Sequence, residues 1–236
     1  MKSRPTIKAI TLDLDDTLWS VWPAIREAEK TLYNWMIEHA PATAAATTTE
    51  TLTIARNEIE NLFPQHKHDL SFYRREAIRR LLKQHGDDEA LAEEGFNVFF
   101  KARQNVNLFK DVTPALEQLS SRYPIVAITN GNANLSVIGL SQFFKDCVSA
   151  QRFGICKPDQ RIFLEAARIL DIGSPAQILH IGDDFKLDVL AAKQVGFQTA
   201  WLRRPELNIP HVQKDELNAA DFLATDLTDL CQQLKL

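Results

Sequence analysis

The chain has 236 residues, of which 45% are hydrophobic and 25% charged, and its formal net charge at pH 7 is −4. These values are ordinary for a globular protein, exclude widespread disorder, and argue against a general attraction to nucleic acid or to an anionic membrane. Because the sequence has no long apolar stretch and its three cysteines are widely spaced, we expect a cytoplasmic protein with no membrane span, disulfide framework or zinc site. The sequence leaves open whether the protein is a monomer or a homodimer.

The first predicted element is a buried parallel strand at residues 7–12, an apolar, β-branched run without turn residues. Residues 19–107 then show helical periodicity almost throughout. Within them we expect a loop at 41–46, a capping box from Thr47 to Glu50, and helices near 51–62, 71–85 and 88–104. This is too much chain for a simple crossover, so we expect an inserted helical bundle.

From residue 111 onward, helices and strands alternate. One helix is expected to be capped by Thr113 and to open at Pro114, another to open at Pro158, and a third to cover about 187–195. Strands are expected at 125–129, 147–150, 178–182, 199–202 and 222–224. This alternation predicts an α/β fold with a Rossmann-like, doubly wound parallel sheet. The predicted domains are a core of residues 1–18 and 108–236 and a helical insertion of residues 19–107.

Three carboxylates, Asp13, Asp15 and Asp16, directly follow the first strand. Like charges this close repel one another, and a cation or a shared proton is needed to make such a cluster stable. For Asp16 we expect no chemical role; its side chain is expected to cap or hydrogen-bond the loop. The carboxyl end of a parallel strand is also where open α/β sheets bind ligands, so chemistry at this point is the first hypothesis.

Other polar residues follow the later strands: Thr129, Asn130 and Gly131, then Lys157, then Gly182, Asp183, Asp184 and Asp188. Because parallel strands point their carboxyl ends in one direction, these groups are expected to meet at one edge of the sheet. Acids, a lysine, a hydroxyl and glycine amides are the groups that a phosphoryl dianion and a divalent metal require. Oxygen ligands favour Mg²⁺ as that metal.

In these motifs the chain resembles the haloacid dehalogenase superfamily of aspartate-nucleophile phosphohydrolases. The DxDxT motif of that family matches Asp13, Asp15 and Thr17, its second and third motifs match Thr129 and Lys157, and its acidic motif matches Gly182, Asp183, Asp184 and Asp188. The insertion at 19–107 resembles the bundle-type cap of the same family.

The resemblance implies a covalent mechanism. Asp13 would attack phosphorus and become an aspartyl phosphate. Asp15 would protonate the leaving alcohol and then deprotonate the hydrolytic water. Mg²⁺ would lie between Asp13, the backbone carbonyl of Asp15 and Asp183, reducing the repulsion between nucleophile and substrate.

The remaining motif residues receive supporting roles from the same resemblance. Lys157 and Thr129, with the backbone amides around Asn130 and Gly131, would hold the phosphoryl oxygens. Thr17 would support the loop, and Asp184 and Asp188 would contact the metal through water or orient Lys157.

Asp15 also indicates the reaction. Dehalogenases of the family lack an acid at this position because they have no leaving alcohol to protonate, so phosphate transfer is favoured. The stretches at 126–133 and 178–184 resemble bacterial riboflavin-pathway phosphatases, which implies FMN or 5-amino-6-(5-phosphoribitylamino)uracil as a small phosphorylated substrate. Alternatives are a phosphatase for phosphoglycolate, sugar phosphates or nucleotides, a phosphosugar mutase, and a non-catalytic regulatory binding module.

Four residues outside the motifs have two interpretations. Trp19 and Trp22 would either stack on a planar substrate or pack in the core or hinge. His66 and His68 have a spacing found in metal sites, but their polar, proline-flanked surroundings favour surface positions. His180, inside a predicted strand, is expected to be a packed core histidine.

Overall fold

A computed structural model describes residues 5–207 and 214–236, and contacts between residues divide the chain into two compact units. The first unit contains Met1–Ser20, Asn107–Gly131 and Leu135–Leu236. The second contains Val21–Val106, which lies inside the expected helical segment, together with Asn132–Asn134. The sequence interpretation had assigned Asn132–Asn134 to the core, and the structure places this short segment with the helices.

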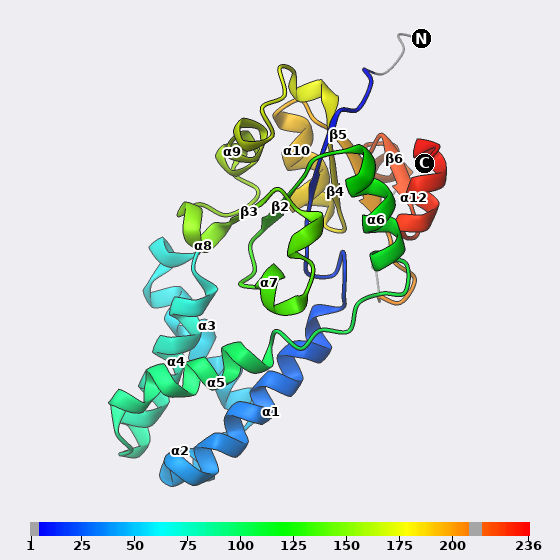
Figure 1. The fold of residues 1–236 in the computed structure, drawn as a ribbon. Helices are drawn as coiled ribbons and strands as arrows, with labels where there is room; N and C mark the ends of the chain where they lie inside the picture. The colour runs from blue at the N-terminus through cyan, green and yellow to red at the C-terminus, as the bar shows by residue number, and fades with distance from the viewer. Residues whose placement is uncertain (1–4, 208–213) are drawn as a thin grey trace. The chain divides into compact units, whose positions relative to one another are not determined.

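The first unit is built on a six-stranded parallel sheet with the order β3-β2-β1-β4-β5-β6 (Figure 1). Every residue of β1, β2, β4 and β5 is buried, as expected for strands covered on both faces. The strands are β1 (Ala9–Leu12), β2 (Ile125–Thr129), β3 (Asp146–Ser149), β4 (Ile178–Gly182), β5 (Gln198–Leu202) and β6 (Phe222–Ala224). The predicted doubly wound α/β fold is confirmed.

Strand β1 lies in the middle of the sheet, between β2 and β4. Thr11 is opposite Val126 on one side and His180 on the other. The chain leaves β1 towards β2 and returns later to β4, so the strand order reverses next to β1. Ligands of open α/β sheets bind outside the carboxyl ends of the strands at such a reversal, which here is the end that carries Asp13.

Helices of the first unit cover both faces of this sheet (Figure 1). On one face, α9 and α10 share an apolar cluster with β1, β2 and β3 that includes Val126, Ile162 and Phe163. On the other face, α6 and α12 pack together. The helices are α6 (Val112–Arg122), α7 (Leu135–Ile138), α8 (Ala150–Phe153), α9 (Gln160–Leu170), α10 (Ala191–Gln194), α11 (Lys214–Leu217) and α12 (Leu227–Leu234).

The helix expected at 187–195 has a different form. A π-helical turn runs from Phe185 to Leu190, and only then does α10 begin. The reason is local: the Asp184 side chain accepts from the backbone N–H groups of Lys186 and Leu187, which opens the turn earlier than periodicity suggested. Inserted π turns of this kind are frequent at functional sites.

The second unit is helical and packs around its own apolar cluster, in which Leu32, Ile78 and Phe99 are buried. Its main elements are α1 (Val21–His39), α2 (Pro41–Ala46), α3 (Thr49–Leu62), α4 (Leu70–His85) and α5 (Ala92–Ala102).

Two expectations for the second unit were wrong. The expected loop at 41–46 is helix α2, which starts at Pro41, a residue whose fixed φ suits a first helical turn. The capping box is made by Thr48 and Thr51, one residue later than expected: each side chain accepts from the other residue's backbone N–H. A Thr hydroxyl serves as well as a Glu carboxylate here because it accepts the same hydrogen bond.

Among the described residues, no helix combines the length and apolar character needed to cross a membrane.

Candidate active site

Asp13 stands immediately beyond β1 and is held by the sheet itself. Its backbone N–H donates to Ile181 O in β4 at 2.9 Å, so the sheet fixes the start of the loop. The Asp13 residue is buried, and burial raises the pKa of its carboxylate to about 7 against the opposing charge of Lys157. The Thr17 hydroxyl lies 3.4 Å from Asp13 Oδ2 and 3.0 Å from Asp183 Oδ1, so it links the ends of the two strands.

Lys157 is buried between two carboxylates. Its Nζ lies 2.5 Å from Asp13 Oδ1 and 2.6 Å from Asp188 Oδ1. Burial alone would lower the pKa of Lys157, but the charges of the two aspartates outweigh burial and hold that pKa above its ordinary value. The lysine is therefore a permanent cation at the carboxylate of Asp13.

The backbone of Lys157 is positioned by Asn130. The Asn130 side chain accepts from Lys157 N at 2.7 Å and donates to Lys157 O at 3.1 Å. The sequence predicted a phosphate contact from the backbone amides around Asn130. In the structure the Asn130 side chain ties the end of β2 to the lysine, a contact that the sequence did not indicate.

Asp188 is almost completely buried and saturated with hydrogen bonds. Oδ1 contacts Lys157 and, at 3.1 Å, His180 Nε2, while Oδ2 accepts from Asp184 N at 3.0 Å. Burial would raise the pKa of Asp188, but Lys157 and His180 hold it well below its usual range. These contacts agree with an orienting role for Asp188.

His180 supports this arrangement from inside β4. Burial lowers its pKa, so the imidazole is neutral. Because a carboxylate only accepts, Nε2–H donates to Asp188, and Nδ1 then accepts from the Thr11 hydroxyl at 2.9 Å. Sequence reasoning placed His180 in the core and missed this contact, since nothing local in the sequence connects it to Asp188.

Asp183 follows β4 and faces Asp13. Burial, reinforced by the charge of Asp13, raises the pKa of Asp183 to about 9. Its backbone carbonyl accepts from the indole of Trp201 at 2.7 Å. Trp201, in β5, is a second supporting residue that the motifs did not indicate. The neighbouring Asp184 is exposed and caps the π-helical turn.

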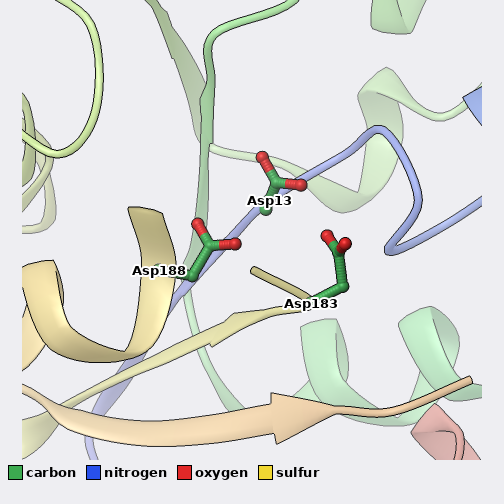
Figure 2. A group of neighbouring side chains, drawn as sticks. All are labelled: Asp13, Asp183 and Asp188. Atoms are coloured by element: carbon green, nitrogen blue, oxygen red, sulfur yellow. The ribbon is translucent and has the colours of Figure 1, made fainter. Parts of the chain in front are cut away.

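The carboxylates of Asp13, Asp183 and Asp188 lie beside one another (Figure 2). Oxygen atoms from all three lie within 4.8 Å of one another, close enough to hold one metal ion. The donor set fits Mg²⁺, which takes carboxylate oxygens and keeps several waters. The sequence prediction had named Asp13, Asp15 and Asp183. The structure gathers Asp13 and Asp183 and brings in Asp188, whose oxygens already accept from Lys157, His180 and Asp184.

Thr129, Gly131 and Asp15 form the other side of the site. The buried Thr129 hydroxyl accepts from Gly131 N at 2.9 Å, which curls the chain at the end of β2. Asp15 Oδ2 lies so close to Gly131 that an added Cβ would be 2.1 Å from it. Glycine is therefore the residue that leaves space for the Asp15 carboxylate.

The residues after Gly131 belong to the helical unit. Asn132 Nδ2 donates to Ser71 Oγ at 3.1 Å, and Asn134 N donates to Gln104 Oε1 at 2.8 Å. The sequence offered no signal for these bonds because the partners are far apart in the chain.

The comparisons with known proteins agree with this geometry. The model of the haloacid dehalogenase-like hydrolase family matches residues 7–196, which include all of the motif residues. The chain belongs to this family. The predicted resemblance is thus confirmed, and the chain is a haloacid dehalogenase-like hydrolase.

Curated relatives of this hydrolase include phosphatases. The chain is 31% identical, over 84% of each chain, to the 5-amino-6-(5-phospho-D-ribitylamino)uracil phosphatase YigB of Escherichia coli. It is 27% identical, over 92% of each, to a glyceraldehyde 3-phosphate phosphatase of Methanopyrus kandleri. The predicted enzyme class, a phosphoric monoester hydrolase, is confirmed.

A solved structure from Pseudomonas syringae pv. Tomato DC3000 is also similar. It is described as a 2-haloacid dehalogenase, has 34% sequence identity and a TM-score of 0.87, and the match covers 98% of this chain and 99% of that one. Phosphatase and dehalogenase relatives therefore share this fold, and the substrate and the roles of the residues have to be argued from the site of this chain.

Proposed function

We propose that this hydrolase is a Mg²⁺-dependent phosphatase of small organic phosphate monoesters and that it works through an aspartyl phosphate on Asp13. The observation that carries the proposal is the pairing of Asp13 with Lys157 at 2.5 Å, beside an acid, Asp15, two residues further on. A cation fixed beside the nucleophile attracts a dianionic substrate, and Asp15 is placed to give a proton to a leaving group that needs one.

In the first step, a carboxylate oxygen of Asp13 bonds to phosphorus while the bond from phosphorus to the ester oxygen breaks. Asp15 gives its proton to that oxygen, so the product leaves as an alcohol. In the second step, Asp15 takes a proton from water, the water oxygen bonds to phosphorus, and the bond to Asp13 breaks to release phosphate. Across the two steps Asp15 alternates between its protonated and ionised forms, whereas Asp13 alternates between a free carboxylate and the aspartyl phosphate.

Lys157 and Thr129, with the backbone amides of Asn130 and Gly131, are proposed to hold the phosphoryl oxygens. Asp13, Asp183 and the backbone carbonyl of Asp15 are proposed to hold Mg²⁺. A bound Mg²⁺ would supply positive charge that offsets the repulsion between the acids and the phosphate. Asp188 is proposed to orient Lys157, because its oxygens are already engaged by Lys157, His180 and Asp184.

We propose FMN or 5-amino-6-(5-phosphoribitylamino)uracil as the first substrate candidates, supported by the match to the E. coli uracil-derivative phosphatase. We also propose that the helical unit acts as the cap that selects the substrate. Matches to glyceraldehyde 3-phosphate phosphatases and to a pyrimidine 5'-nucleotidase keep sugar phosphates and nucleotides as alternatives.

The test is phosphate release from a panel of both flavin-pathway compounds, glyceraldehyde 3-phosphate, phosphoglycolate and a pyrimidine nucleotide, with and without Mg²⁺. We expect the highest kcat/KM for a flavin-pathway compound, activity that depends on Mg²⁺, and none in Asp13→Asn. Faster turnover of another ester would refute the substrate proposal. Phosphate returned to the sugar instead of to solution would indicate a mutase, and no release from any ester would indicate a non-catalytic module.

A second assay addresses the dehalogenase alternative. Chloride release from 2-chloropropionate is expected to be absent, because the site provides Asp15 for an alcohol leaving group that this reaction lacks. Chloride release that exceeds phosphate release from every ester would overturn the phosphatase assignment.

To test the cap proposal, Ser71→Ala and Gln104→Ala are compared with wild type across the panel. If the helical unit selects the substrate, the ranking of the esters by kcat/KM changes in these variants. An equal loss for every ester would contradict it.

A further inference from the structure

The side chain of Asp15 is held from both sides by residues of the core unit. Trp19 is fully buried, and its indole Nε1–H donates to Asp15 Oδ1 at 2.9 Å. The backbones of the two residues also bridge each other, and Asp16 N donates to Trp19 O at 2.8 Å. A four-residue loop thus closes on itself and carries the carboxylate at a fixed place.

The place of Trp19 is set in turn by the chain that returns to the core. Trp19 forms an isolated backbone bridge with Leu108, and Phe109 N donates to Leu18 O at 3.0 Å. The indole ring therefore has little freedom to move away from Asp15. Of the two interpretations that the sequence allowed for Trp19, stacking on a substrate or packing in the core, its complete burial agrees with packing.

The second oxygen of Asp15 faces Gly131. A Cβ at position 131 would lie 3.2 Å from Thr129 Oγ1 and 2.1 Å from Asp15 Oδ2, and the second of these contacts is impossible unless the carboxylate moves. The Trp19 indole therefore holds one oxygen of Asp15, and the lack of a side chain at Gly131 leaves space for the other.

We propose that Trp19 is the positioning residue of the general acid and base, and that it directs Asp15 Oδ2 towards the ester oxygen beside the Gly131 backbone. This inference rests on the proposed phosphatase function. The chemical reason is that an indole N–H only donates. The carbonyl oxygen of a protonated carboxyl is its better acceptor, so the indole favours Oδ1 as the acceptor and leaves the transferable proton on Oδ2.

The first experiment compares Trp19→Phe with wild type on two esters. Glycerol phosphate has an alkoxide leaving group that requires a proton, whereas p-nitrophenyl phosphate has a leaving group that does not. We expect Trp19→Phe to lower kcat/KM for the alkyl ester by about tenfold or more, which is part of the roughly 10²–10⁴-fold contribution of general acid catalysis, and to change kcat/KM for the aryl ester much less.

Trp35→Phe is the matched control, because Trp35 is a buried tryptophan of the helical unit outside the site. It should leave the ratio between the two esters unchanged. Asp15→Asn calibrates the full loss of the acid and should show the same selectivity as Trp19→Phe, only larger. An equal fall for both esters in Trp19→Phe, or no fall for either, would overturn the positioning role.

Two measurements need no activity and separate this inference from the proposed function. A crystal structure of Trp19→Phe should show the Asp15 carboxylate moved from Gly131 while Asp13 and Lys157 stay in contact. In NMR spectra, the Trp19 indole N–H resonance should lie further upfield in Asp15→Ala than in wild type. If wild type hydrolyses neither ester but both structural results hold, the phosphatase proposal fails and the contact between Trp19 and Asp15 stands. If the carboxylate does not move or the resonance does not shift, the contact itself is refuted.

Discussion

The guanidinium of Arg204 makes two parallel hydrogen bonds, of 2.9 and 3.0 Å, to the carboxylate of Asp111, although Arg204 has no exposed surface. The same guanidinium donates through Nε to Thr17 O at 2.7 Å. Since the Thr17 hydroxyl contacts both Asp13 and Asp183, this buried ion pair supports the loop that carries the candidate nucleophile.

Removing one member of this pair should be costly. In Asp111→Ala the buried guanidinium loses its counter-charge, and we expect the free energy of unfolding to fall by about 3 kcal/mol. Urea denaturation measures the change. The control is Arg161→Ala, which breaks an exposed bidentate pair with Asp159 and should change stability by no more than about 0.5 kcal/mol. Equal losses of unfolding free energy in the two variants would show that the buried pair stabilises the fold no more than the exposed pair does.

The same pair predicts a pH dependence. Burial alone would raise the pKa of Asp111, but the hydrogen bonds and charge of Arg204 outweigh it and hold that pKa below its ordinary value. On acidification the unfolded chain therefore binds its proton first, near pH 3.9, and the stability from the pair, fully present above that pH, is lost as the pH falls through the lower folded pKa. Thermal melting of Asp111→Asn should consequently depend less on pH between about 5 and 3. Parallel wild-type and variant curves would contradict this.

Gly182 should tolerate no side chain. A Cβ at the end of β4 would lie 2.4 Å from Asp188 Cγ, so Gly182→Ala must displace Asp188 from Lys157. We expect a stability loss of about 1–3 kcal/mol, typical of overpacking, together with a large fall in kcat. Gly173→Ala is the control, because an added Cβ there meets nothing within 4 Å. Calorimetry and phosphate release on both variants provide the measurement, and a fully active Gly182→Ala enzyme would exclude an orienting role for Asp188.

Removal and return of Mg²⁺ should change stability through Asp183. Because the pKa of Asp183 is raised to about 9, its contribution to the stability of the metal-free protein falls as the pH rises from about 4 towards 9. At pH 8, metal-free Asp183→Asn should thus be at least as stable as metal-free wild type. Added Mg²⁺ should raise the melting temperature of wild type and leave that of Asp183→Asn nearly unchanged.

Asp171→Asn, which changes an exposed aspartate, is the control for the Mg²⁺ addition. Its melting temperature should rise with Mg²⁺ as much as that of wild type. If Mg²⁺ stabilises Asp183→Asn as much as wild type, the metal does not bind at the proposed acids.

Local sequence was sufficient for most of the fold. The strands at 125–129, 178–182 and 222–224 have the predicted bounds; for the first two the reason is that continuous apolar runs rich in β-branched residues have few alternatives to a buried strand. Element boundaries were less certain where side chains compete for backbone groups, as at the Thr48 capping box and at the π-helical turn that Asp184 caps.

The sequence by itself determined the family, the parallel sheet and the motif residues at its carboxyl edge, since strand ends and characteristic spacings are local properties. Only the tertiary structure decided how those residues are held: Asp188 by His180, the Lys157 backbone by Asn130, Asp15 by Trp19 and Gly131, and Thr17 by Arg204. Most of these partners are distant in sequence or carry no motif, and the physical reason is that a hydrogen bond depends on distance and direction in space, which the fold alone supplies.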